Sequence, residues 1–87
     1  MSTPRVVMYS TRFCPYCMRA RSLLKRRGVD HEEIGVGWNQ ALWAEMRRLS
    51  GRDTVPQIFI DGQPVGGYDD LAALEQSGEL DRLLGRI

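Results

Sequence analysis

Cys14 and Cys17 are the residues of this 87-residue chain best suited to chemistry, and two residues separate them. Thiols at this spacing can close a small disulfide, or they can supply two of the four ligands of a zinc ion. The sequence contains no other cysteine and a single histidine, His31, so it is one ligand short of such a zinc site. The spacing therefore favours reversible oxidation of the two thiols over metal binding.

The residues around the cysteine pair predict a strand followed by a helix. Residues 6–9 are apolar and rich in β-branched side chains, which predicts a buried strand that ends shortly before Cys14. Pro15 suits the first turn of a helix, where its missing N–H costs no hydrogen bond, and Gly28 predicts the end of that helix. The apolar residues that recur at the spacing of one helix face are Phe13, Cys17, Ala20 and Leu24.

This position gives the two thiols different properties. The first turn of a helix presents unpaired N–H groups and about half a positive charge, which stabilises a thiolate on Cys14. We expect Cys14 to be exposed and to have a substantial thiolate fraction near neutral pH. Cys17 lies one turn further into the helix, so we expect its sulfur to be more buried and less acidic. Cys14 is then the candidate nucleophile, and Cys17 is the candidate resolving thiol.

The remaining residues predict three more strands and three more helices. Asp61-Gly62 is a strong signal for a two-residue hairpin turn, and Pro64 indicates that the returning strand lies at an edge of the sheet. The predicted elements are a strand at 31–36, a helix at about 39–50, strands at 57–60 and 63–66, a helix from Asp69 or Asp70 to about Ser77, and a last helix containing Leu80, Leu83, Leu84 and Ile87.

The order of these elements predicts an α/β fold. Its first half is a parallel βαβ unit, and its second half begins with a hairpin and is an antiparallel ββα unit. We therefore expect a mixed four-stranded sheet flanked by helices. The length suits a single domain over residues 1–87.

Composition excludes several classes of protein. The hydrophobic fraction of 43% and the charged fraction of 26% are ordinary for a globular domain and argue against a disordered chain or a coiled coil. No apolar run is long enough for a signal peptide or a membrane span, so we expect a cytoplasmic protein.

Charge is unevenly distributed along the chain. The net charge of +1 gives no general reason to expect nucleic acid as a partner. Residues 1–27 nevertheless hold seven of the twelve basic side chains, and residues 28–87 hold all eleven acidic ones. The basic residues form either a solvated helix face or a positive environment for a thiolate and for anionic ligands near Cys14.

Three segments together resemble the signature sequences of the glutaredoxins. Residues 9–17 (YSTRFCPYC) are similar to the active-site segment of that family, residues 54–62 (TVPQIFIDG) to its second signature, and residues 66–71 (GGYDDL) to its third. They occur in the order and spacing of the family, and the likeness covers nearly the whole chain. The resemblance implies a thioredoxin-like fold.

The same resemblance implies a function. It implies a glutathione-dependent thiol–disulfide oxidoreductase that reduces protein–glutathione mixed disulfides and protein disulfides. Cys14 is then the nucleophile, Cys17 is the resolving thiol, and glutathione is the co-substrate. We expect a monomer that acts on glutathionylated or disulfide-containing proteins and that binds neither metal, nucleic acid nor membrane.

A glutathione site follows from the resemblance as well. It implies a cis Val55–Pro56 bond, whose backbone faces Cys14 and pairs with the tripeptide as with an added strand. The N–H groups at a helix N-terminus would hold the γ-glutamyl carboxylate, and an aspartate would hold its ammonium group. The residues implied are Arg12, Tyr16, Thr54, Val55, Pro56, Gly67, Tyr68, Asp69 and Asp70. The two aspartates could also cap a helix, and that purely structural role is compatible with glutathione binding.

One position departs from the family pattern. Trp43 stands where many glutaredoxins have Gln or Arg directed at the glycine carboxylate of glutathione. Arg47 lies one turn further on the same helix face and is a further candidate for that contact, beside Arg12. We expect both Trp43 and Trp38 to belong to the core.

Two other functions remain open from the sequence. One is a thioredoxin-type reductase that receives electrons from a flavoenzyme instead of glutathione, against which Arg12 and the segment at Tyr68 and Asp69 argue. The other is a dimer that bridges an iron–sulfur cluster through Cys14 and two glutathione molecules. The resemblance implies that Pro15 disfavours this form, because cluster-binding members more often have Gly or Ser at that position.

Overall fold

The computed structural model describes residues 5–86 and contains four strands and four helices. The elements, in order, are β1 (Val6–Ser10), α1 (Pro15–Arg26), β2 (Glu32–Gly35), α2 (Gln40–Ser50), β3 (Gln57–Ile60), β4 (Gln63–Gly66), α3 (Tyr68–Ser77) and α4 (Glu79–Leu83). Their order is the one predicted from the sequence. Ile87, which was expected in the last helix, lies outside the described residues.

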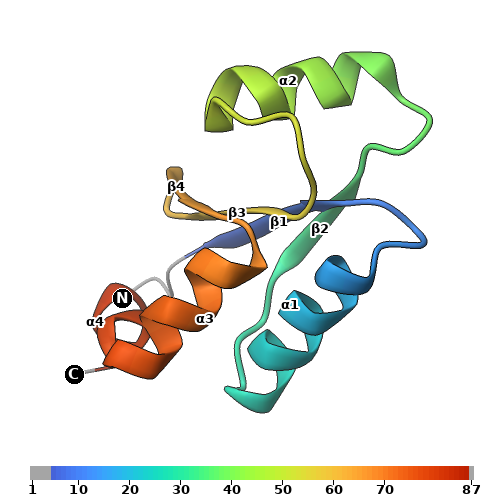
Figure 1. The fold of residues 1–87 in the computed structure, drawn as a ribbon. Helices are drawn as coiled ribbons and strands as arrows, with labels where there is room; N and C mark the ends of the chain where they lie inside the picture. The colour runs from blue at the N-terminus through green and yellow to red at the C-terminus, as the bar shows by residue number, and fades with distance from the viewer. Residues whose placement is uncertain (1–4, 87) are drawn as a thin grey trace.

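The four strands form one mixed sheet in the order β2-β1-β3-β4 (Figure 1). β1 pairs with β2 in parallel, whereas the β1–β3 and β3–β4 pairs are antiparallel. The predicted parallel and antiparallel halves are therefore confirmed, and so is the edge position of Pro64 in β4. The hairpin turn has positive φ at both central residues, 51° at Asp61 and 80° at Gly62, as an Asp-Gly turn requires.

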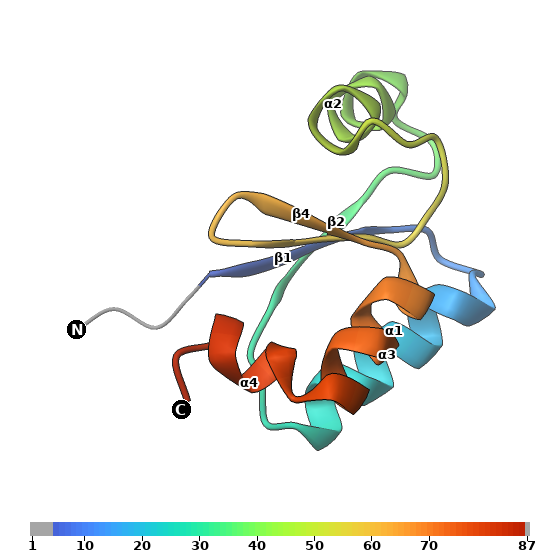
Figure 2. The same cartoon turned by 60° about the vertical axis from the view of Figure 1, so that its left-hand side comes forward.

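Helices cover both faces of the sheet. Figure 2 shows α1, α3 and α4 on one face and α2 alone on the other. Successive residues of a strand point to opposite faces, so Met8 packs beneath α1 and α3 while Tyr9 packs beneath α2. The larger core includes Met8, Leu24, Ile58, Leu71 and Leu80, and the smaller one comprises Tyr9, Val36, Met46 and Phe59.

Three apolar residues are more exposed than the sequence pattern predicts. Phe13 precedes α1 instead of belonging to its buried face, and it is 88% exposed. Trp38 was expected in the core but is fully exposed, because it lies in the turn between β2 and α2 while Val36 takes the buried position before that turn. Leu49 is exposed because α2 directs Met46 into the smaller core instead.

A cluster of polar side chains joins α1 to β2. Arg21 donates two hydrogen bonds of 2.7 Å to the two carboxylate oxygens of Glu33. His31 lies 3.0 Å from the same carboxylate, and the Ser10 hydroxyl donates to it at 3.1 Å. The Arg21 guanidinium, above all, lowers the pKa of Glu33 to about 2.

Among residues 5–86, no helix has the length and apolar character to cross a bilayer.

Replacement of Glu33 by Gln is expected to remove the pH-dependent stabilisation that the ionised Glu33 carboxylate gives to the fold. A carboxyl whose pKa is lower in the folded protein stabilises the fold above its unfolded value, and this contribution disappears as the pH falls through the folded value. The free energy of unfolding of Glu33→Gln in urea should therefore fall by about 2 kcal/mol at neutral pH, with the difference from the native chain narrowing below about pH 4.5. The neighbouring Glu32→Gln, which removes only an exposed ion pair with Arg5, is the control. A Glu33→Gln deficit that is the same at every pH would contradict this account.

Candidate active site

The Cys14 sulfur caps the N-terminus of α1. Cys14 has an extended backbone (φ −119°, ψ 110°), and the helix begins with Pro15. Its Sγ accepts a hydrogen bond of 3.1 Å from the Cys17 N–H, in the way that a Ser or Asp side chain caps a helix. The Cys17 N–H and the positive end of the α1 dipole are therefore both directed at the Cys14 sulfur.

The two thiols differ less in burial than expected, but Cys17 is the more buried of the two, as expected. Both cysteines are free thiols, Cys14 with 8% and Cys17 with 0% of its surface exposed. The expectation of an exposed Cys14 was therefore wrong, because Cys14 is buried as well. Burial, reinforced by the adjacent Cys14, raises the pKa of Cys17 to about 12. Cys17 is thus a protonated thiol near neutral pH.

The loop before β3 brings a backbone carbonyl to the reactive sulfur. The Val55–Pro56 peptide bond is cis, which confirms the expectation from the resemblance. The Val55 carbonyl oxygen lies 3.8 Å from Cys14 Sγ and accepts the weak hydrogen bond of the thiol. The Val55 backbone is therefore next to the position at which Cys14 would form a mixed disulfide.

Gln57 anchors this loop from the buried strand β3. Its side-chain Nε2 donates to the Thr54 carbonyl oxygen at 3.0 Å and to Thr54 Oγ1 at 3.3 Å. Gln57 is 1% exposed, and all four residues of β3 are buried. From the sequence, Gln57 was expected only as a strand residue. Its anchoring role could have been recognised from the presence of a polar residue within an otherwise apolar strand that has no solvent face.

Tyr16 and Tyr68 bring the first turns of α1 and α3 together. Their ring centroids are 6.5 Å apart, and the Arg19 guanidinium lies 5.3 Å from the Tyr16 ring centroid. Gly67 lies close to the loop before β3, since a Cβ at that position would be 3.5 Å from the Pro56 carbonyl oxygen. The structure therefore gathers residues 14–17, 54–56 and 67–70, which lie far apart in the sequence, around Cys14.

The N-terminus of α3 is capped differently from the prediction. Gly67 is the N-cap residue, whereas Asp69 and Asp70, each a predicted cap, lie inside the first turn. Asp70 accepts the Gly67 N–H at 3.0 Å and pairs with Arg52 at 2.8 Å. Arg52, which the sequence analysis did not single out, is the main cause of a lowered Asp70 pKa. The Asp70 carboxylate is thus already engaged, while Asp69 is exposed beside it.

Arg12 and Arg47 have different surroundings. The exposed Arg12 contacts the Phe13 ring, with its guanidinium carbon 5.8 Å from the ring centroid. Arg47 instead forms an ion pair of 3.0 Å with Asp53, whose carboxylate also accepts the Trp43 indole N–H. These hydrogen bonds lower the pKa of Asp53, with the larger effect from Trp43 and the smaller one from Arg47. Asp53 of the same chain therefore already compensates the Arg47 charge.

Metal ligands do not gather at this site. Within residues 5–86, no group of three or more His, Cys, Asp or Glu side chains is arranged to hold a metal ion. The hydrogen-bond partners of Cys14 and Cys17 other than each other are backbone groups of Val55 and Thr11. The chemistry that this arrangement supports is thiol–disulfide exchange.

Replacement of Gly66 by Ala is expected to disturb the third segment of the site. Gly66 has φ +116°, and a Cβ there would collide with the Asp70 carboxylate and lie 3.0 Å from Arg52 Nη1. The strain and the displaced carboxylate should together lower the free energy of unfolding by about 2–3 kcal/mol in a urea titration. Gly62→Ala is the matched control, because Gly62 also has positive φ (80°) but has open space around it. Its loss should be about 1 kcal/mol, and equal losses in the two variants would refute the proposed collision.

Comparison with known sequences identifies close relatives. The family model described as Glutaredoxin matches residues 6–65. A glutaredoxin of Pseudomonas aeruginosa is 54% identical over 81 residues, which cover 93% of this chain and 96% of that protein. Glutaredoxin 3 of Escherichia coli is 52% identical over 79 residues, which cover 91% of this chain and 95% of that protein.

Comparison with solved structures gives the same result. The solution structure of a glutaredoxin from Brucella melitensis is 49% identical, with a TM-score of 0.86, and the match covers 99% of this chain and 94% of that one. A buckwheat glutaredoxin crystallised as its glutathione complex is 28% identical with a TM-score of 0.86, over 94% of this chain and 77% of that one. The fold is thioredoxin-like, as expected. With its two thiols at the start of α1 and these relatives along nearly its full length, the chain belongs to the glutaredoxin family of thiol–disulfide oxidoreductases.

Proposed function

We propose that the protein reduces protein–glutathione mixed disulfides, with glutathione as its reductant. The observation that carries this proposal is the position of Cys14 Sγ, which accepts the Cys17 N–H at 3.1 Å and lies 3.8 Å from the Val55 carbonyl. The backbone N–H of Cys17 and the backbone of Val55 therefore surround the sulfur that would attack the disulfide.

The reaction is written as two exchanges. The Cys14 thiolate attacks the glutathione sulfur of the mixed disulfide, which forms a bond between Cys14 and glutathione and releases the thiolate of the protein substrate. A second glutathione thiolate then attacks the glutathione sulfur of that intermediate. This step forms glutathione disulfide and returns the electron pair to Cys14. Cys17 takes no part, and its high pKa keeps it protonated and a poor competitor.

Protein disulfides would follow a second route through Cys17. The Cys14 thiolate attacks one sulfur of the substrate disulfide and forms an intermolecular disulfide. Cys17 loses its proton and attacks the Cys14 sulfur, which releases the second substrate thiolate and closes the Cys14–Cys17 disulfide. Two glutathione molecules then reduce that disulfide. Glutaredoxin potentials of about −200 to −230 mV are close to that of the glutathione couple, so this last step is feasible.

The glutathione molecule would lie across the three segments that surround Cys14. Val55, between Thr54 and Pro56, offers its backbone to the extended tripeptide. Tyr16 and Tyr68 form an aromatic wall, and Gly67 with the first turn of α3 receives the γ-glutamyl carboxylate. Asp69 receives the ammonium group, because Asp70 is engaged by Arg52 and Gly67 and serves to fix this helix terminus. The buckwheat relative, crystallised as a glutathione complex, supports the presence of a glutathione site in this fold.

We also propose the setting in which this reaction occurs. The protein would act as a single-domain monomer in the cytoplasm, on glutathionylated and disulfide-containing proteins. The bacterial relatives match this chain over nearly their full length, which supports the single-domain part of this proposal.

Single cysteine variants test the two routes separately. Cys14→Ser should abolish activity on every substrate, because no other group provides the attacking sulfur. Cys17→Ser should keep the activity on a small glutathione mixed disulfide and lose the reduction of a protein disulfide. Both activities are measured with glutathione, glutathione reductase and NADPH. Loss of both activities in Cys17→Ser would refute the division of roles, and activity with thioredoxin reductase in place of glutathione would favour the thioredoxin-type alternative.

Arg12 and Arg47 variants test which residue binds the glycine carboxylate of glutathione. Arg12→Gln should raise the KM for glutathione about tenfold, because a charge-assisted hydrogen bond is lost. Arg47→Gln should raise it less than twofold, because Asp53 already compensates the Arg47 charge. Steady-state kinetics with varied glutathione measure both values. A larger effect of Arg47→Gln would reverse this assignment.

A further inference from the structure

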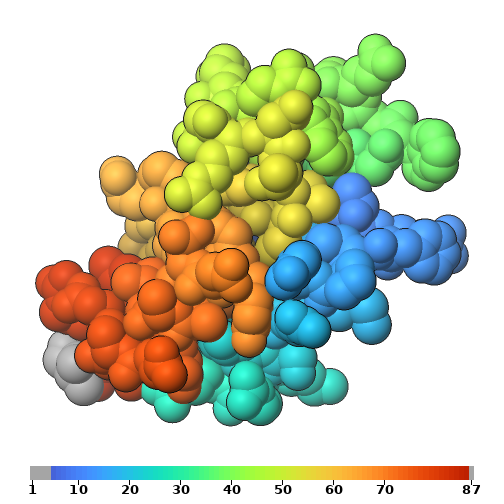
Figure 3. Space-filling model, viewed as in Figure 1, coloured from blue at the N-terminus to red at the C-terminus, as the bar shows by residue number. Residues whose placement is uncertain are grey.

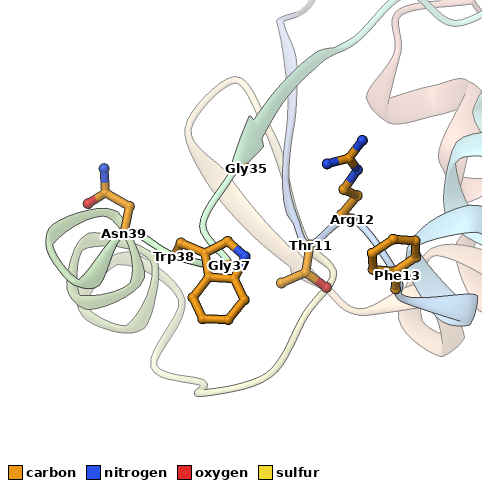
Figure 4. Close-up of a pocket in the computed structure, with 7 residues that line it drawn as sticks. All are labelled: Thr11, Arg12, Phe13, Gly35, Gly37, Trp38 and Asn39. Atoms are coloured by element: carbon orange, nitrogen blue, oxygen red, sulfur yellow. The ribbon is translucent and has the colours of Figure 1, made fainter.

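An open concavity of about 660 Å³ lies between the segment that leads into Cys14 and the turn between β2 and α2. It is lined by Thr11, Arg12, Phe13, Gly35, Gly37, Trp38 and Asn39. Figure 4 shows the Phe13 and Trp38 rings on either side of Thr11. In the space-filling view, segments 11–13 and 37–39 project as two lobes with a notch between them (Figure 3). Of the proposed glutathione residues, only Arg12 borders this concavity.

Two aromatic side chains are displayed at this concavity without a role in the core. Phe13 is 88% exposed and immediately precedes Cys14, and Trp38 is fully exposed. Neither ring belongs to the two apolar clusters of the fold. Large aromatic side chains that remain in water next to a depression are typical of surfaces that bind another molecule.

The segment that carries Trp38 is held in place by its neighbours. The Val36 N–H donates to the Ser10 carbonyl at 2.9 Å, and Val36 is 1% exposed. Asn39 caps α2, with its side chain accepting the Leu42 N–H at 3.0 Å. Trp38 therefore lies two residues after the buried Val36 and directly before Asn39, which caps the helix. This arrangement presents the indole with little backbone freedom to lose on binding.

Charge indicates which partner fits. Arg12 is the charged residue among the seven that line the concavity, and residues 1–27 contain seven basic side chains and no acidic one. A guanidinium has five N–H donors, so Arg12 can contact the glycine carboxylate of glutathione and a second carboxylate together. The partner should therefore combine an apolar side chain with an acidic one.

We infer that this concavity binds the protein side of the mixed disulfide, as an extended segment with an apolar and an acidic side chain next to its glutathionylated cysteine. The inference rests on the proposed function. Glutathione would lie against residues 54–56 and 67–70 and reach Arg12 with its glycine carboxylate, so the substrate chain would lie beyond Arg12, toward Phe13 and Trp38. The apolar side chain lies between the two rings, and the carboxylate lies at Arg12.

Kinetics with two glutathionylated peptides test the inference. One nine-residue peptide has leucine two positions from the central cysteine and aspartate beside it, and the matched peptide has serine and asparagine there. Trp38→Ser and Phe13→Ser should each lower kcat/KM for the leucine–aspartate peptide about tenfold. Trp38→Ser, which leaves Arg12 and its contact with Phe13 intact, should not change kcat/KM for a small mixed disulfide of glutathione and 2-mercaptoethanol. Leu49→Ser, which removes another exposed apolar residue, should change neither value.

A binding experiment separates this surface from the reaction. The leucine–aspartate peptide with serine in place of its cysteine cannot react, and it should shift the indole N–H resonance of Trp38 in an NMR titration. An unshifted resonance, or unchanged kinetics of Trp38→Ser with the glutathionylated peptide, would overturn the inference. If the native chain fails to reduce the small mixed disulfide while the indole shifts, the proposed function is wrong and the surface is supported.

Discussion

The hydrogen bond between the Cys17 amide and the Cys14 sulfur is the interaction on which the rest of the site depends. It exists because the chain turns directly from the central strand β1 into α1, so the first residue able to cap the helix is Cys14. The cap uses a backbone group that every helix leaves unpaired, and so the fold itself provides the electrostatic stabilisation that a thiolate needs. Pro15 favours this start, because it fixes the backbone of the first helical residue.

The difference between the two thiols follows from the same turn of helix. Cys14 lies at the N-terminal end of α1 with 8% of its surface exposed, whereas Cys17 lies one turn further, near the Thr11 backbone, and is fully buried. One thiol therefore gains from the helix terminus, and the other loses from desolvation. Two identical side chains acquire different reactivity through position alone. The surrounding segments add the backbone and the charges that a peptide disulfide would meet.

Much of the fold and the central chemistry was predictable from local sequence. The Asp61-Gly62 turn, the edge position of Pro64 and the helix start after Cys14 are each set by a few neighbouring residues. These are local preferences of the backbone, and periodicity is sufficient to place them. The placement of Cys17 in the core also followed, because it shares a helix face with Ala20 and Leu24.

What the sequence did not predict depends on contacts between distant segments. The Arg52–Asp70 pair joins residues from a loop and a helix, and the Gln57 amide is bound only because Thr54 folds back over it. Trp38 was misplaced because hydrophobicity predicts burial, whereas a residue in a turn has no neighbouring layer to bury it. Phe13 fits the helical period by spacing, yet the helix begins after it, and helix ends are the least predictable part of such a pattern.

The solitary position of α2 has a consequence for how the molecule opens. The other three helices share the larger core with β1 and β3, whereas α2 rests on a smaller cluster around Met46 (Figure 2). Local unfolding requires the least free energy where the fewest apolar contacts must separate. Amide hydrogens of α2 should accordingly exchange with solvent through a partial opening that leaves α1 and its cysteines folded. The helix that carries the cysteines, α1, and the helix that covers the opposite face of the sheet, α2, therefore differ in local stability.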